Sequence, residues 1–273
     1  MEQGIAYYNE GDITQAIRCF EYVTKDQVDN AEAWRWLGQC WAQHEEDKLA
    51  IAALRQCITI DPYNTQALLM LGVSYTNNLN NQQALTYLRT WIENNPQYID
   101  LVNSLHDGVE SDTDTLQDHV VRMYQRAVEK HPEDYHLWTV LGVLHHINSE
   151  YDQAIASFQE AIKLHDDDSE LWNKLGATLS NAGKPAEGVE ALQRALQLRP
   201  RYVRARANLG ISYYNQGQHW KAATSFLSCL TQNSSPSHLW IFLRMSFNYL
   251  GRDDLADLVK FHDPELFRPH ISF

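Results

Sequence analysis

Asparagine recurs along this sequence at a fixed spacing, and its side chain has the chemistry to bind the backbone of a peptide. Asn9 and Asn77 are two steps of 34 residues apart, Asn181 and Asn215 are one step apart, and three steps plus two residues separate Asn77 from Asn181. An asparagine amide is both a hydrogen-bond donor and an acceptor. A row of such amides can therefore pair with both polar groups of an extended peptide, whatever its side chains are.

Two basic residues stand close to asparagines in an otherwise acidic protein. The formal net charge is −13, yet Lys174 follows Asn173 directly and Arg204 precedes Asn208 by four residues. A fixed positive charge beside such amides is suited to bind a carboxylate. The excess of acidic residues repels a nucleic acid at long range and favours basic ligands. We therefore expect a peptide partner and no nucleic-acid partner.

The sequence offers little to a catalytic hypothesis. It has no Gly-rich phosphate loop, no G-x-S-x-G elbow and no H-E-x-x-H pair. The adjacent His145 and His146 would point about 100° apart on a helix, so they cannot share a metal as histidines at i and i+4 do. The four cysteines form no C-x-x-C pair, which favours reduced thiols in a core. We predict no enzyme activity, no metal and no cofactor.

Targeting segments are likewise not indicated. No run of about 18 apolar residues is present, which predicts that the chain has no direct membrane span. The first residues, MEQGIAYYNEG, are acidic and lack the basic and apolar regions of a secretory signal. A cytoplasmic protein is the expectation.

The asparagine spacing belongs to a repeat that runs through nearly the whole chain. Gly4, Gly38 and Gly72 are 34 residues apart, and Gly142, Gly176 and Gly210 continue the same step after a two-residue insertion. Proline recurs at the junctions between repeats. Small and large residues recur at fixed distances from the glycines. These phased residues are Ala16, Ala50, Ala84, Ala154, Gly188 and Ala222 twelve positions after the glycines, and Phe20, Leu54, Leu88, Phe158, Leu192 and Phe226 sixteen positions after them.

Each period predicts two antiparallel helices, with small residues where the helices approach closely and large residues where they interlock. Four positions before the glycines stand Trp34, Leu68, Trp138, Trp172 and Arg206, of which only the last is polar. The pattern resembles the tetratricopeptide repeat. It predicts an all-α superhelical solenoid of about seven repeats with a concave groove.

Two regions break the pattern and divide the chain into four expected segments. The acidic stretch from Asn103 to Asp118 predicts a loop or hinge in a degenerate fourth repeat, and residues 231–237 predict a loop before a capping helix. The expected segments are an N-terminal group of repeats (1–96), the degenerate fourth repeat or hinge (97–132), a C-terminal group of repeats (133–234) and a C-terminal loop with capping helices (235–273).

One face of the first helix in each repeat points away from the expected core. With the repeat glycine at zero, positions −6, −3, −2, +1 and +5 fall between about 60° and 160° around the helix. We call these positions the ligand stripe. Its predicted members are Asn173, Lys174, Ala177 and Asn181 in the sixth repeat, Arg204, Asn208, Ile211 and Asn215 in the seventh, and Val73 and Asn77 in the third.

Segments such as LLMLGVSYTN, LWNKLGATLSN and RARANLGISYYNQG resemble the repeat domain of import receptors for the type 1 peroxisomal targeting signal, the C-terminal S-K-L tripeptide and its variants. The resemblance covers about residues 30–260 and implies two groups of three repeats, with the tripeptide entering a funnel between them. The residues that it implies as peptide-binding are Asn77, Asn173, Asn181, Asn208 and Asn215 for the backbone, Lys174 and Arg204 for the carboxylate, Val73, Thr76 and Ala177 around small pockets, and Glu45 and Asp47 for the lysine. Ile211 and Ser212 are further expected peptide contacts.

The resemblance also implies partners and a place in the cell. The receptors cycle between cytoplasm and peroxisome and bind docking proteins through a long N-terminal region that has no counterpart here, so we expect this sequence to be a monomeric fragment. His146 stands where the family usually has an asparagine. Three alternatives remain open, namely an accessory subunit that grips the tail of a membrane channel, a scaffold that binds a folded partner on its convex surface, and a clamp for acidic tails.

Overall fold

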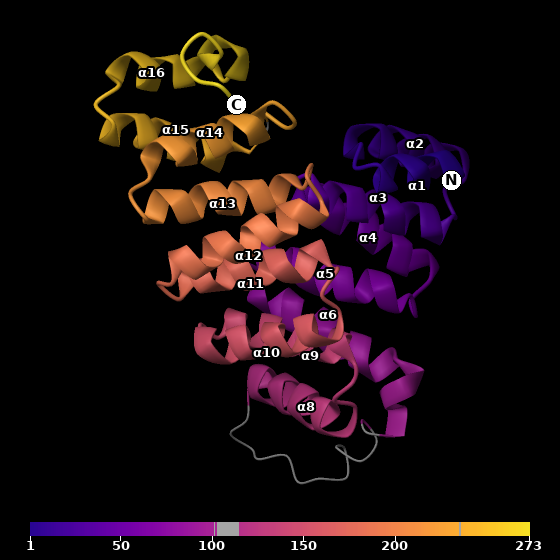
Figure 1. Ribbon diagram of the computed structural model, residues 1–273. Coiled ribbons are helices and arrows are strands. Elements are labelled where there is room, and N and C mark those ends of the chain that lie inside the picture. Colours follow the sequence, from indigo (N-terminus) through magenta and orange to yellow (C-terminus); the bar gives the residue numbers. More distant parts are fainter. Residues whose placement is uncertain (101, 103–114, 235) are drawn as a thin grey trace. The chain divides into compact units, whose positions relative to one another are not determined.

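The computed structural model describes residues 1–100, 102, 115–234 and 236–273, and within these ranges the chain is helical without strands (Figure 1). The predicted all-α tetratricopeptide solenoid is confirmed. Successive helices alternate between a first and a second helix of each repeat. The first helices are α1 (Glu2–Asn9), α3 (Ala31–Gln43), α5 (Thr65–Asn77), α9 (Tyr135–Ile147), α11 (Ser169–Asn181), α13 (Val203–Asn215) and α15 (Ser237–Tyr249).

The second helices follow each of these after a short turn, and the fourth repeat contributes its second helix, α8. They are α2 (Ile13–Asp26), α4 (Asp47–Ile60), α6 (Asn81–Asn94), α8 (Leu116–Lys130), α10 (Tyr151–Leu164), α12 (Pro185–Leu198), α14 (His219–Leu230) and α16 (Asp253–Leu258). Short 3₁₀ helices complete the fold, η1 (Pro96–Tyr98) after α6, and η2 (Val259–Phe261) and η3 (Pro264–Phe267) after α16.

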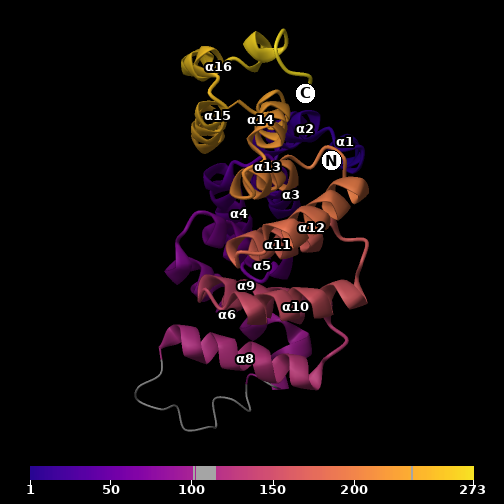
Figure 2. The same ribbon diagram turned by 60° about the vertical axis from the view of Figure 1, so that its left-hand side comes forward.

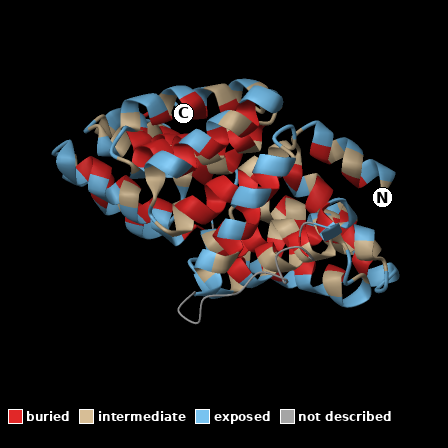
Figure 3. Cartoon of the chain, turned by 90° about the horizontal axis from the view of Figure 1, so that it is seen from below, coloured by how far each residue is buried: buried red, intermediate tan, exposed pale blue. Residues whose placement is uncertain are grey.

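The chain forms two compact units, Met1–Asp166 and Asp167–Phe273. The second unit stacks α11 to α16 in chain order, as both ribbon views show (Figure 2). Buried positions lie mainly on the helix sides that face other helices (Figure 3). The division into four segments expected from the sequence stays a prediction. None of the helices in the described ranges has the length and apolar character needed to cross a membrane.

The phased glycines let the two helices of a repeat approach closely, as the sequence predicted. A Cβ at Gly142 would lie 2.6 Å from the Phe158 ring, and a Cβ at Gly210 would lie 2.5 Å from the Phe226 ring. Both phenylalanines are almost fully buried. A larger residue at either glycine would therefore have to push the ring out of the core, which explains why glycine and a large residue recur sixteen positions apart.

The repeat position that most often holds tryptophan, four residues before the glycine in most repeats and before Arg244 in the last helical pair, has a polar function as well as an apolar one. The indoles of Trp34, Trp138 and Trp240 donate hydrogen bonds to the carbonyl oxygen six residues earlier, at 2.9, 2.9 and 3.0 Å. Arg206 occupies the same position, and its Nη2 donates to the Pro200 carbonyl at 2.6 Å. Arg206, the polar residue at this repeat position, thus makes the same bond as these three tryptophans. The bond connects the first helix of a repeat to the segment that links it to the preceding repeat.

In each repeat whose turn between helices the structure describes, that turn contains one residue with positive φ. The residues at this turn position are Gly11 (79°), Glu45 (68°), Leu79 (57°), Ser149 (61°), Gly183 (76°), Gly217 (71°) and Gly251 (65°). Side chains with a Cβ disfavour this left-handed conformation, so three repeats carry local strain where four have glycine. The position repeats in phase with the glycines of the first helices, although its residue types differ.

The fourth repeat keeps its phase in α8. Val120 and Tyr124 are fully buried and stand 34 residues before Ala154 and Phe158, so they fill the small and large positions of the repeat. The loop expected from Asn103 to Asp118 ends earlier than predicted, because Thr115 and Asp118 form a capping box that starts α8 at Leu116. Residues 103–114 of that expected loop lie outside the described residues.

The predicted C-terminal helical segment is confirmed and continues the repeat spacing. α15 begins 34 residues after α13, and Ala256 of α16 stands 34 residues after Ala222. Leu239, Leu243 and Phe247 of α15 are fully buried against the core of the second unit. This last helical pair therefore covers the apolar face of α13 and α14.

Candidate peptide-binding site

Within the second unit, two of the polar residues predicted on α11 and α13, Asn173 and Asn208, contact each other. Asn173 is only 5% exposed, and its Oδ1 accepts a hydrogen bond from Asn208 Nδ2 at 2.9 Å. Asp168 caps α11 by accepting from the Glu170 amide, which fixes where that helix begins. The sequence placed the two asparagines on one stripe, and the structure joins them across neighbouring helices.

This bond leaves a matched pair of polar groups for a ligand. In this bond Asn173 uses its amide oxygen and Asn208 uses its amide nitrogen. The Asn173 amide nitrogen and the Asn208 amide oxygen have no hydrogen-bond partner among the described residues. A peptide unit carries one N–H donor and one C=O acceptor. The pair therefore offers a donor and an acceptor that fit an extended backbone.

Basic side chains of the second unit gather around Glu170. Lys174 Nζ lies 3.9 Å from Glu170 Oε2, and Arg199 Nη1 lies 4.0 Å from Glu170 Oε1. Burial raises the pKa of the neighbouring Tyr202 hydroxyl, Glu170 adds to that rise, and the positive charges of Arg204 and Arg199 oppose it. Glu170, at position −6 of the stripe, is thus a carboxylate held among the cations, and the sequence reading did not single it out.

The remaining stripe residues of the second unit differ in exposure. Asn181 and Asn215 are exposed at the ends of α11 and α13, and Ala177 and Ile211 are half-buried. Ser212 is fully buried between the two helices, so it can act on a ligand only through its neighbours.

The first unit places four predicted residues on α4 and α5, and a fifth, Glu45, in the turn before α4. Asn77 Nδ2 donates to Asp47 Oδ1 at 3.2 Å, so this amide and this carboxylate form one polar group. Thr76 bonds the Gly72 carbonyl of its own helix at 2.9 Å, and Val73 is half-buried. Glu45 has a φ of 68° at the turn where other repeats have glycine.

His146, the departure from the family pattern, is mostly buried in α9. Burial lowers the pKa of its imidazole below the ordinary value. Its ring lies 5.5 Å from the Tyr151 ring in an edge-to-face arrangement. Within the described ranges, no group of histidine, cysteine and acidic side chains is arranged to hold a metal ion.

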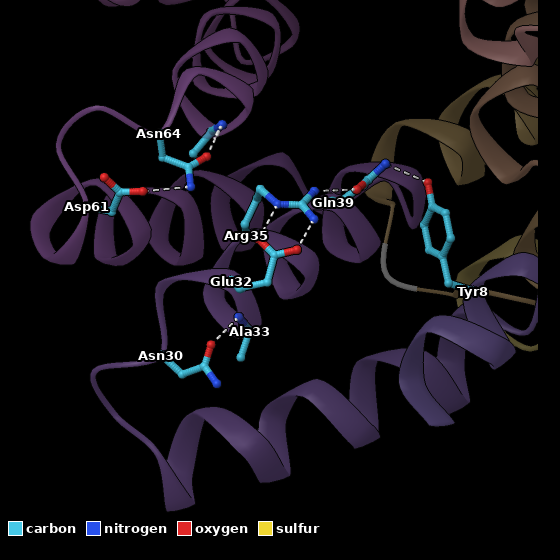
Figure 4. Close-up of polar contacts among 9 residues, drawn as sticks. Tyr8, Asn30, Glu32, Ala33, Arg35, Gln39, Asp61 and Asn64 are labelled. Atoms are coloured by element: carbon cyan, nitrogen blue, oxygen red, sulfur yellow. Dashed lines mark hydrogen bonds and ion pairs between the residues drawn. The ribbon is translucent and has the colours of Figure 1, made fainter. Parts of the chain in front are cut away.

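A polar row on α3 was missed by the sequence reading. Arg35 is buried, its Nε and Nη2 donate to both carboxylate oxygens of Glu32, and its Nη1 donates to Gln39 Oε1 (Figure 4). Gln39 Nε2 donates in turn to Tyr8 Oη at 2.8 Å. Glu32, Arg35 and Gln39 occupy positions −6, −3 and +1 around Gly38, so applying the stripe offsets to the second repeat would have found them. The row is internally paired and ties α1 to α3.

Comparison with known families agrees with this architecture. One tetratricopeptide-repeat family model matches residues 1–65, 121–169 and 173–236, and a second tetratricopeptide-repeat model matches residues 66–98. The chain therefore belongs to the tetratricopeptide-repeat family. A thermophilic tetratricopeptide protein of Thermus thermophilus shares the fold, with a TM-score of 0.50 and 13% identity over 80% of this chain and 98% of that one.

The resemblance to receptors is also confirmed. The chain is 38% identical to the "Peroxisomal targeting signal receptor" of Yarrowia lipolytica and 33% identical to the protein of that name in Candida albicans. These matches cover 96% and 97% of this chain. The chain spans about half the length of these relatives, 47% and 48%.

Proposed function

We propose that this chain is the receptor module that binds the C-terminal SKL-type tripeptide of cargo proteins for import into the peroxisomal matrix. The observation that carries the proposal is the Asn173–Asn208 bond, which leaves one donor and one acceptor on the two helices that also carry Lys174 and Arg204. The relatives named peroxisomal targeting signal receptor support the same function. The proposal requires no catalytic residue.

In this proposal the protein recognises the ligand through its peptide backbone and its C-terminal carboxylate. The Asn173 amide donates to a peptide carbonyl, and the Asn208 amide oxygen accepts from a peptide N–H. Lys174 and Arg204 bind the terminal carboxylate, in part through water. Asn181 and Asn215, exposed at the helix ends, bind further backbone groups, and Ala177 and Ile211 contact small or apolar side chains.

The residues of the first unit contribute charge and shape in the proposal. Glu45 and Asp47 attract the lysine of the tripeptide, Asn77 binds backbone, and Val73 and Thr76 contact a small side chain. Because Asp47 and Asn77 lie at the surface, the attraction for lysine is modest and salt-sensitive. We further propose that the whole protein cycles between cytoplasm and peroxisome and meets its docking partners through a region outside this chain.

Fluorescence anisotropy with a labelled peptide ending in Ser-Lys-Leu tests the proposal. The peptide is used as a free acid and as a C-terminal amide, and a Ser-Gln-Leu acid reports on Glu45 and Asp47. Tight binding of the Ser-Lys-Leu acid, weak binding of its amide and intermediate binding of Ser-Gln-Leu are expected. Binding of neither Ser-Lys-Leu form would contradict the proposal and favour a scaffold for a folded partner.

A further inference from the structure

Two serine hydroxyls are buried between α11 and α13, one to two helical turns beyond the amide pair. Ser180 Oγ and Ser212 Oγ lie 2.6 Å apart, and the two residues are 8% and 0% exposed. Ser180 Oγ also lies 3.0 Å from the Gly176 carbonyl oxygen, and Ser212 Oγ lies 2.9 Å from the Asn208 carbonyl oxygen. Because two hydroxyl oxygens at this separation need a proton between them, one serine donates to the other and the second donates to its own helix.

Gly188 of α12 makes room for this hydroxyl pair. The other complete repeats have alanine at this position, whereas a Cβ at Gly188 would lie 2.5 Å from Ser180 Oγ and 2.8 Å from the Gly176 carbonyl oxygen. Glycine inside a helix is less stable than alanine. Gly188 therefore replaces the usual alanine at the place where the Ser180 hydroxyl and the Gly176 carbonyl fill the space that an alanine methyl group would need.

The hydroxyl pair and the amide pair connect the same two helices. Ser212 follows Asn208 by four residues, about one turn, and Ser180 follows Asn173 by seven residues, about two turns. One side-chain bridge would still let α11 and α13 rotate or slide against each other. Two bridges at different heights restrain both movements more than one does, and with them the arrangement of the Asn173 and Asn208 amides.

We propose that the Ser180–Ser212 hydrogen bond is a positioning clasp that holds Asn173 and Asn208 in the bonded arrangement that exposes one donor and one acceptor to the ligand. The proposal rests on the peptide-binding function proposed above and adds two residues that do not touch the ligand. A ligand that needs the amide pair pre-organised loses affinity when the clasp is cut, even where the fold persists.

Ser180→Ala and Ser212→Ala test the clasp, with Ser246→Ala as a matched control. Ser246 is fully buried and occupies in α15 the position that Ser212 has in α13. Its hydroxyl donates to the Phe242 carbonyl at 2.8 Å and has no side-chain partner on another helix among the residues that the structure describes. For the Ser-Lys-Leu acid we expect roughly three- to tenfold weaker binding in Ser180→Ala and in Ser212→Ala, and unchanged binding in Ser246→Ala. The ratio of acid affinity to amide affinity should be unchanged in all three variants, because Lys174 and Arg204, which bind the terminal carboxylate, are intact.

A covalent clasp provides the rescue. Cys19 is partly exposed, whereas Cys40, Cys57 and Cys229 are buried, so it is first replaced by serine. In this Cys19→Ser background, Ser180→Cys combined with Ser212→Cys should restore wild-type affinity when oxidised to a disulfide and lose it again on reduction. Urea unfolding of every variant separates affinity from stability. If Ser180→Ala and Ser212→Ala lower stability but bind peptide as the wild type does, the clasp is only structural and the inference is overturned. If the wild type binds neither peptide form, the proposed function itself is overturned, and this inference with it.

Discussion

Asn208 Nδ2 donates a hydrogen bond to Asn173 Oδ1 across the interface between α11 and α13, and Asn173 is almost completely buried. A buried acceptor that loses its donor keeps the cost of its lost hydration. The Asn208–Asn173 hydrogen bond therefore contributes both to peptide binding in the proposed site and to the stability of the fold. An exposed asparagine at the end of a helix, such as Asn215, carries no such link.

Asn208→Ala should accordingly lower both the free energy of unfolding and the affinity for the Ser-Lys-Leu acid, each by about 1–3 kcal/mol. Asn215→Ala should weaken peptide binding while changing stability by less than about 0.5 kcal/mol. Urea unfolding and anisotropy on the same samples check both quantities. An Asn208→Ala protein with wild-type affinity would show that this residue does not line the site.

Glu170→Gln should tighten binding of the free acid about two- to fivefold, the range of a partly exposed ion pair. The Glu170 carboxylate lies 3.9 Å from Lys174 Nζ, so it competes with the ligand carboxylate for that cation. The gain should shrink at high salt and be absent for the amide peptide. Glu160→Gln, which removes a surface pair with Lys163 in the first unit, is the control. Weaker acid binding in Glu170→Gln would mean that Glu170 orients Lys174 instead of competing for it.

Leu79→Gly should stabilise the protein by about 0.5–1 kcal/mol, because Leu79 has a φ of 57° and an 89% exposed side chain with little packing to lose. Gly183→Ala, at the equivalent turn with a φ of 76°, should destabilise it. Midpoints of urea unfolding report both changes. Loss of stability in Leu79→Gly would show that the entropy of the unfolded chain outweighs the strain of the turn.

His146→Asn should flatten the pH dependence of stability below about pH 6.5. Burial lowers the pKa of His146 from its ordinary value of 6.5, so the unfolded chain binds the proton before the folded chain does. The contribution of a neutral His146 to stability is thus complete above pH 6.5 and is lost as the pH falls through the folded-state pKa. Urea unfolding at pH 7.5, 6.5 and 5.5 measures it. Equal pH slopes for wild type and His146→Asn would contradict the assignment to this residue.

The repeat itself could be predicted from sequence because its physical cause is local and periodic. A glycine sixteen residues before a large side chain, such as Gly142 before Phe158, records a close helix contact in the sequence. The left-handed turn position was not recognised, since Glu45, Leu79 and Ser149 share neither size nor polarity with the glycines at that position. Backbone conformation there is imposed by the stacking of the helices.

The candidate site could be predicted in part. The stripe offsets placed Asn173 and Asn208 on one face, but no spacing rule states that their side chains bond each other. Ser180 was not singled out and Ser212 was expected near the ligand, because which hydroxyl faces a neighbouring helix depends on how α11 packs on α13. Glu170 was passed over because one more acidic residue does not stand out in an acidic protein.

The most direct test of the account compares the affinity of the Ser-Lys-Leu acid with that of its amide in the wild type and in Lys174→Ala combined with Arg204→Ala, by isothermal titration at one fixed salt concentration. If these two cations read the terminal carboxylate, the wild type prefers the acid by at least tenfold, and the double variant binds both forms with the same, weak affinity. A double variant that still prefers the acid as strongly as the wild type would contradict the account, because the carboxylate would then be bound elsewhere.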